Sequence, residues 1–493
     1  MNLRTTSVWL AQAAWLLCGC SSGDSSAFKP DPGPVVTRGT VSVSVTSTGA
    51  ELDSDGYALL IDGVNVGTIS GTSNSSVPNL RTGEHSVGMT GLSCNCTVVG
   101  LNPQVITVSN GVTTPTSFAV SCPDHTLDPE VTALQVAGDG FAMTAADGHV
   151  LVARTEHPAS PAGDVLAVSA LTFDATAPFR TIRFTDPNTA MLDELHVAML
   201  DASDAIVAVT RQPTSGTQTQ VRLFRFNNVF DTAPGITVWR EMTPLALGYS
   251  LRSAQANGLS LPVVVWDDET QPGSHLSMVG VVDNNGVATT LSTLADQPAH
   301  VGITIGSADS GYLAGVTTPG SIELHPLDLN GVAAQDFQVL ADSAAENPIH
   351  EATSVAWCID RYAVTWWRAA PDPGSTGVPR AELRAVTVNR NGEPLQAPVT
   401  LGAAVDLSGG ADLHGVGIGC LENAGFAIAH ADEDTGLHLL LTDANLAVQV
   451  ERSIVTADEL AAGTAPKVVA NNTTVLVAWT EAPGDTRVSR SCQ

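Results

Sequence analysis

The sequence predicts an all-β protein, with a small N-terminal β-sandwich followed by a seven-bladed β-propeller. Three observations predict this fold. Short runs that alternate apolar and polar residues, typical of strands with one buried face, recur from residue 39 onward. Aromatic residues make up only 5% of the chain, and valine, threonine, alanine and glycine take their place, which suits many short strands. One apolar motif then recurs seven times at intervals near 50 residues, as in a propeller.

The first 37 residues predict an export signal and a tether. Residues 1–19 place Arg4 ahead of an apolar run, Val8 to Leu17, which has the length of a signal peptide and is too short to span a bilayer. Residues 20–37 are small, polar and rich in proline, a composition that cannot bury a core, so we expect a disordered tether. The alternative is an ordinary secretory signal whose cysteines are incidental.

The junction Leu17-Cys18-Gly19-Cys20 resembles the lipobox of bacterial lipoproteins. The resemblance implies that Cys20 becomes the first mature residue and carries a thioether-linked diacylglycerol, usually with an N-linked acyl chain such as palmitate. More than one acyl chain is needed for stable anchoring in a membrane. Ser21 stands where an aspartate would favour retention in the inner membrane, so the resemblance implies the outer membrane of the cell envelope.

Composition narrows the range of partners. Fifty acidic residues against 21 basic ones give a formal net charge of −29, which argues against nucleic acid as a partner and against docking on anionic lipid. Of the eight cysteines, six remain after Cys18 and Cys20, and in an oxidising compartment an even number predicts disulfides. Cys94-Asn95-Cys96 also suggests a metal site, but no second close pair or histidine cluster accompanies it. We therefore expect no metal and no other cofactor.

Residues 38–123 predict the β-sandwich. GTVSVSVTS, from Gly39, puts three alternate valines on one face, and Asp62-Gly63 and Asn110-Gly111 mark turns between apolar runs. About seven short strands fit this length. The segment from LDSDGYALLIDG to TSFAVSC resembles PEGA-like or Ig-like modules of bacterial surface proteins, although the Pro-Glu-Gly-Ala signature is absent. That resemblance implies a disulfide between Cys96 and Cys122.

Residues 124–493 predict the propeller. The repeated runs are VLVART at 150, AIVAVT at 205, LPVVVW at 261, YLAGVT at 312, YAVTWW at 362, FAIAHA at 426 and VLVAWT at 475. Other apolar runs and tight turns, at 283–286, 328–331 and 389–392, complete units of about four strands, the size of a blade. The last unit has room for three strands, and the run 131–137 is predicted to supply the fourth. An array of two or three β-sandwiches is the alternative.

Cys358 and Cys420 fall at nearly matching places in neighbouring units, so we predict that they form a disulfide between adjacent inner strands. Cys94 and Cys492 are then the two cysteines left over, and elimination alone suggests a third disulfide between them.

No catalytic motif stands out: the chain has no H-E-x-x-H, G-x-S-x-G, phosphate-binding loop or dinucleotide fingerprint. At the fifth position of the repeated run, three units carry valine and four depart from it, with Arg154, Trp366, His430 and Trp479. One interpretation is a hydrogen-bonded structural role in a core between blades. The other is a ligand site on the propeller axis, with the tryptophans as stacking platforms beside the histidine.

The sequence therefore favours a surface-tethered lipoprotein, a non-catalytic binding or scaffold protein of the cell envelope with a protein or glycan partner. The alternative is a propeller enzyme, a lyase, hydrolase or lactonase acting on carbohydrate, whose residues would converge on the axis from several blades.

Overall fold

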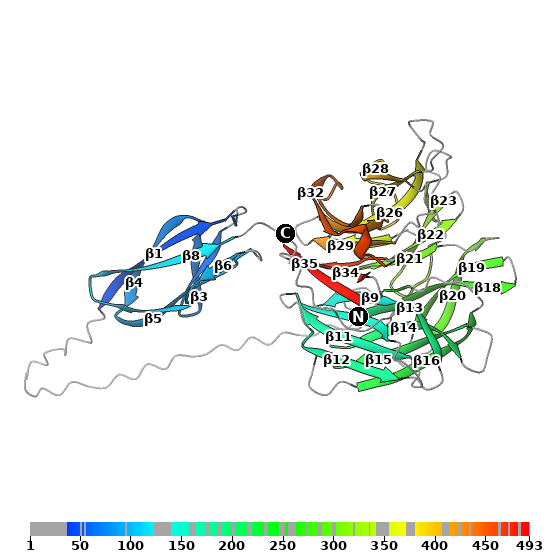
Figure 1. Ribbon diagram of the computed structural model, residues 1–493, viewed down its shortest axis with the longest axis horizontal. Helices are drawn as coiled ribbons and strands as arrows, with labels where there is room; N and C mark the ends of the chain where they lie inside the picture. Colours follow the sequence, from blue (N-terminus) through cyan, green and yellow to red (C-terminus); the bar gives the residue numbers. More distant parts are fainter. Residues whose placement is uncertain are drawn as a thin grey trace, which may run out of the picture.

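The structure, a computed structural model, describes residues 37–122 and 140–492 apart from gaps of one to twelve residues. The described chain is all-β, and its one helix is a single 3₁₀ turn, η1 (Ala457–Glu459). No helix among these residues has the length and apolar character needed to cross a membrane. The strands form two bodies, a β-sandwich and a β-propeller (Figure 1).

Two four-stranded sheets form the sandwich. The first, in spatial order, contains β4 (Ser73–Arg81), β1 (Arg38–Thr48), β8 (Thr113–Ser121) and β6 (Thr97–Val99). The second contains β3 (Val64–Ile69), β2 (Tyr57–Ile61), β5 (Gly83–Thr90) and β7 (Gln104–Val108). Strand β1 pairs antiparallel with β4 and parallel with β8, the latter through nine consecutive residue pairs from Thr40↔Thr113 to Thr48↔Ser121.

The sandwich core lies between these two sheets. The predicted alternation along β1 is confirmed, because Val41, Val43 and Val45 are buried whereas the residues between them are more exposed. The predicted turn at Asp62-Gly63 joins β2 to β3 with both residues in the left-handed region, φ 53° and 78°, as a two-residue hairpin turn requires.

Within residues 140–492, as far as they are described, seven sheets form the propeller, each an antiparallel meander in sequence order. The first three are β9 (Phe141–Ala146), β10 (His149–Glu156), β11 (Val165–Thr172) and β12 (Arg180–Thr185); β13 (Thr189–Met199), β14 (Ala205–Pro213), β15 (Thr219–Asn227) and β16 (Gly235–Leu245); and β17 (Arg252–Ala254), β18 (Val263–Gln271), β19 (Ser274–Val282) and β20 (Ala288–Gln297). The fourth and fifth are β21 (Gly302–Ala308), β22 (Gly311–Thr318), β23 (Ser321–Leu327) and β24 (Gln338–Ala341); and β25 (Ser354–Cys358), β26 (Arg361–Ala370), β27 (Arg380–Val388) and β28 (Val399–Asp406). The sixth and seventh are β29 (Val416–Leu421), β30 (Gly425–Asp432), β31 (Gly436–Thr442) and β32 (Val448–Val455); and β33 (Lys467–Ala470), β34 (Thr474–Glu481) and β35 (Asp485–Cys492).

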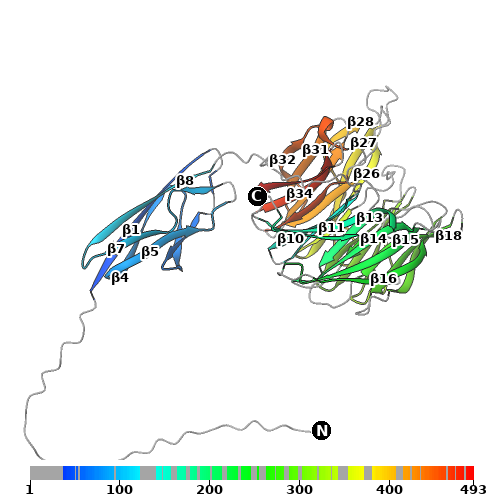
Figure 2. The ribbon, with the colours of Figure 1, turned by 60° about the horizontal axis from the view of Figure 1, so that its bottom comes forward.

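The sheets close into a ring (Figure 1, Figure 2). The first strand of each sheet contacts the first strand of the next, and β33 of the seventh sheet contacts β9 of the first. One hydrophobic core, which contains Val152, Ala429 and Val477, accordingly joins the sixth, seventh and first sheets. Such a ring leaves no open end in the series of sheets, unlike a row of sandwiches. The run 131–137, predicted as the fourth strand of the seventh sheet, lies outside the described residues.

The repeated apolar run of the sequence is the second strand of every sheet, from β10 to β34. A second strand is covered by a neighbouring sheet on each of its faces, so its residues are buried without alternation; Thr474 to Trp479, for example, are all buried. This explains why the run is continuously apolar.

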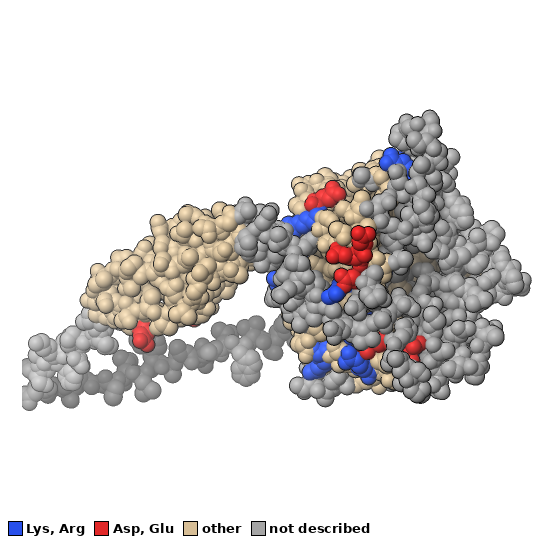
Figure 3. Space-filling model, viewed as in Figure 1, with Lys and Arg blue, Asp and Glu red and all other residues tan. Residues whose placement is uncertain are grey.

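The described charged side chains on the face seen in Figure 3 lie mostly on the propeller, with acidic and basic groups interspersed, and few lie on the sandwich. Among the described residues on that face, the basic side chains form no large patch.

Candidate functional site

Cys20, the predicted lipidation site, lies outside the described residues, as do Cys94 and the side chain of Cys492. The structure contains both of the other predicted disulfides. Cys96–Cys122 joins the end of β8 to the chain just before β6 within the sandwich core, and Cys358–Cys420 joins β25 of the fifth sheet to β29 of the sixth.

The four residues predicted from the repeated run do not meet on the axis. Arg154, Trp366, His430 and Trp479 lie on second strands of four different sheets and are 2%, 0%, 6% and 3% exposed. The strands that line the ring's centre are the first strands instead. Trp366 packs in the core shared by the fourth and fifth sheets, and Trp479 in the core that joins the sixth, seventh and first. This placement corrects the axial interpretation and favours the structural one.

Arg154 is held by an internal polar network. Its guanidinium donates to the carboxylate of Glu156 at 2.6 Å and to the hydroxyl of Ser169 at 2.7 Å, and Glu156 also accepts a hydrogen bond from Arg183 at 3.0 Å. Burial lowers the pKa of Arg154, and the charge of Glu156 acts in the opposite direction. A buried cation requires such a partner, so the network accounts for an arginine at an otherwise apolar position.

His430 lies between the fifth and sixth sheets. Its ring meets Trp367 edge to face, with ring centroids 5.9 Å apart, and stacks on His438 of the neighbouring strand at 5.3 Å. The contacts are those of a ring packed within a core and do not form a ligand platform.

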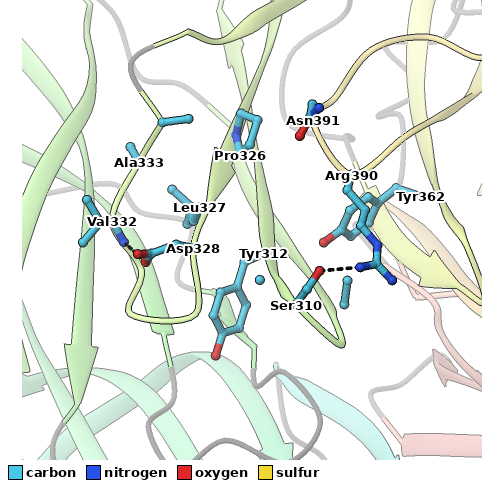
Figure 4. A pocket seen from close by; sticks show the side chains of 13 residues that line it. Ser310, Tyr312, Pro326, Leu327, Asp328, Val332, Ala333, Tyr362, Arg390 and Asn391 are labelled. Carbon is cyan, nitrogen blue, oxygen red and sulfur yellow. Dashed lines mark hydrogen bonds between the residues drawn. The ribbon is translucent and has the colours of Figure 1, made fainter. Parts of the chain in front are cut away.

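A pocket lies elsewhere, between the fourth and fifth sheets. It has a volume of about 450 Å³, within the range of small-molecule sites. Three connections border it: the turn from β21 to β22, the segment from β23 to β24, and the turn from β27 to β28 (Figure 4).

The inner wall of the pocket is aromatic and apolar. Tyr312 on β22 and Tyr362 on β26 line it together with Leu327, and all three are buried in the protein interior. Burial raises the pKa of the Tyr362 phenol, so this group stays neutral and keeps its O–H at physiological pH.

The positively charged side chain of the pocket, Arg390, lies at its rim. The guanidinium of Arg390 donates to the hydroxyl of Ser310 at 2.8 Å, from the opposite sheet (Figure 4). Its central carbon lies 4.9 Å from the ring centre of Trp357, within the range of a cation–π contact. Trp357 in turn meets Tyr362 edge to face at 4.8 Å. The side chain of Arg390 is therefore supported on two sides.

The two bordering loops are held by the turns that the sequence predicts at 328–331 and 389–392. The side-chain oxygen of Asp328 accepts hydrogen bonds from the backbone of Asn330 and Val332, and Asn389 accepts them in the same way from Asn391 and Glu393. These contacts fix the loops that present the rim of the pocket.

The described lining of the pocket is poor in carboxylates. Asp328 is the one carboxylate among the lining residues that the structure describes, and one oxygen of that group already accepts two backbone hydrogen bonds. Glycoside hydrolysis in most families uses two carboxylates on either side of the bond. Within the part of the chain that the structure describes, no group of three or more histidine, cysteine or acidic side chains is arranged to hold a metal.

Sequence reasoning missed this pocket because it identified the two loops only as turns. One signal was available: the three predicted turns read DNNG, DLNG and NRNG, and the second position is a cation only in the last, at Arg390. The equivalent positions of the other two turns are the uncharged Asn284 and Leu329. The arginine therefore distinguishes the fifth unit from the other two.

No protein-family model and no curated protein matches this chain. Solved structures similar to it are propeller-type proteins. They include the lectin BP39L from Burkholderia pseudomallei (12% identity, TM-score 0.48, covering 73% of this chain and 96% of that one), the α-L-arabinofuranosidase Arb93A from Fusarium graminearum (8%, 0.44, 62% and 93%) and the arabinanase Arb43A from Bacillus subtilis (9%, 0.33, 60% and 92%). At these identities the similarity concerns the fold and carries no function to this chain.

Proposed function

We propose that this protein is a lipid-anchored, non-catalytic binding protein of the bacterial cell envelope, in which the propeller holds a small polar ligand. The lipobox-like junction ending at Cys20 and the tether at 20–37 support the anchoring. The observation that carries the binding function is the pocket between the fourth and fifth sheets, where a supported arginine and two tyrosines line one cavity with a single carboxylate.

The anchor is tested by comparing the full chain with two serine variants. Cys20→Ser removes the proposed lipid attachment, whereas Cys18→Ser removes a neighbouring thiol that has no such role. We expect wild type and Cys18→Ser in the membrane fraction, with a mature N-terminal peptide heavier by the mass of its acyl groups, and Cys20→Ser without that added mass. An unmodified N-terminal peptide in the wild type would refute the anchoring.

Binding is separated from catalysis by following both in one sample. The full chain is incubated in detergent with neutral and acidic monosaccharides, and with arabinan and polygalacturonate as polymers, while products are analysed by mass spectrometry. We expect saturable binding of a monosaccharide and no new products. Product formation that disappears when the pocket is filled by Ala333→Trp would replace the proposal with the carbohydrate-active enzyme. Ala397→Trp, an exposed alanine outside the pocket, is the matched control.

A further inference from the structure

We propose that the pocket between the fourth and fifth sheets recognises an acidic saccharide, with the carboxylate of the sugar held by Arg390. This inference deepens the proposed binding function and rests on it. Arg390 is an exposed guanidinium on the pocket rim, and its donors other than the one facing Ser310 have no partner within the described chain.

The contrast with other arginines supports an anionic ligand. Arg154, Arg361 and Arg368 each form an ion pair with a carboxylate of the chain. In a protein with 50 acidic residues such partners are abundant, yet Arg390 has none among the described residues. A guanidinium carries five N–H donors, and one donates to Ser310, so an edge remains for the two parallel hydrogen bonds that a carboxylate accepts.

Arg390 is also held in place before any ligand arrives. The hydrogen bond to Ser310 and the ring of Trp357 restrict the guanidinium, and Trp357 itself rests on Tyr362. An arginine that is already ordered loses less conformational entropy when it binds, which raises the affinity of the contact.

The remainder of the cavity fits a sugar ring better than a lone anion. A volume of about 450 Å³ exceeds what one carboxylate fills, and the walls combine apolar side chains, such as Pro326 and Val332, with polar groups such as the amide of Asn391 (Figure 4). A pyranose ring also combines apolar and polar surface, because its faces carry C–H groups and its edge carries hydroxyl groups. Arg390 then supplies the discrimination between a uronic acid and its neutral counterpart.

The test uses two pairs of probes that differ only at C6. Glucuronate is compared with glucose, and galacturonate with galactose, by calorimetry on the full chain in detergent, with inorganic phosphate as a third anion. We expect at least one uronate to bind about 10-fold or more tightly than its neutral counterpart, because hydrogen bonds to charged groups contribute that much. Arg390→Gln should abolish the difference, and Arg390→Lys should restore only part of it, since lysine lacks the planar fork.

Arg361→Gln is the control, because this arginine lies on β26 of the same sheet but pairs with Asp360 outside the pocket. It should leave uronate binding unchanged, and near-ultraviolet circular dichroism should show that all variants are folded. Equal affinity for uronate and neutral sugar, unchanged binding in Arg390→Gln, or binding of phosphate alone would overturn the inference. If the uronate and the neutral sugar bind equally well and Ala333→Trp abolishes the binding of both, the inference fails but the proposed binding function stands. Turnover of the polymers would refute the inference and the proposed binding function together.

Discussion

Removal of the disulfide between Cys358 and Cys420 is expected to weaken the propeller and leave the sandwich intact. The bond joins strands of the fifth and sixth sheets across 62 residues of sequence. In the chain-entropy description, a closed loop of that size lowers the entropy of the unfolded chain by about 14 cal/mol/K, which corresponds to about 4 kcal/mol at 25 °C. The double variant Cys358→Ala/Cys420→Ala should lose up to that amount of unfolding free energy.

Tryptophan fluorescence during urea unfolding measures this loss selectively. Outside the predicted signal, every tryptophan of the chain lies beyond residue 123, so the signal follows the propeller alone. The matched control is Cys96→Ala/Cys122→Ala, which removes a 26-residue linkage worth about 3.5 kcal/mol from the sandwich and should leave the tryptophan transition in place. A tryptophan midpoint in the first variant that equals the wild-type midpoint, together with no effect of reductant on the wild type, would refute the reasoning.

Three further outcomes follow from described contacts. Glu156→Gln leaves the buried guanidinium of Arg154 without its carboxylate and should cost about 3–5 kcal/mol of propeller stability, measured by the same tryptophan transition. The hydrogen bond that His85 donates to the carboxylate of Asp62 raises the pKa of His85, and a hydrogen bond from the backbone N–H of Ser86 lowers the pKa of Asp62. The pair therefore stabilises the sandwich most between about pH 4 and 6.5, and this contribution is lost as pH rises through the folded pKa of His85. Asp62→Asn should therefore bring the pKa of His85 back toward its ordinary value in an NMR titration; an unchanged titration would contradict the assignment. Gly417→Ala should lower the melting temperature, because a Cβ there would lie 2.6 Å from the backbone oxygen of Pro466, the residue just before β33. A variant as stable as wild type would show that the sixth sheet and this segment can move apart at no cost.

The architecture was predictable because backbone geometry leaves a periodic trace in the sequence. The alternation at Val41, Val43 and Val45 indicates a sheet with one buried face, whereas the recurring apolar run indicates strands that are buried on both faces. The pairing of Cys358 with Cys420 followed from their matching places in successive units, since equivalent positions of neighbouring sheets are close in a ring.

The site was not predictable in the same way. The polar residues at the fifth position of the run, such as Arg154, appeared available for a ligand because their partners come from other strands that the run itself does not reveal. The pocket instead unites Ser310 with Arg390, two loop residues 80 positions apart, and no periodicity connects them. The packing of the neighbouring fourth and fifth sheets brings these loops together.

The parallel pairing of β1 with β8 has a mechanical consequence. The chain enters the sandwich at the start of β1 and leaves it at the end of β8, and the two strands run side by side in the same direction through nine registered pairs. Tension applied across this module would therefore slide the two strands past each other and strain all of their hydrogen bonds together, which resists rupture far better than opening them one at a time.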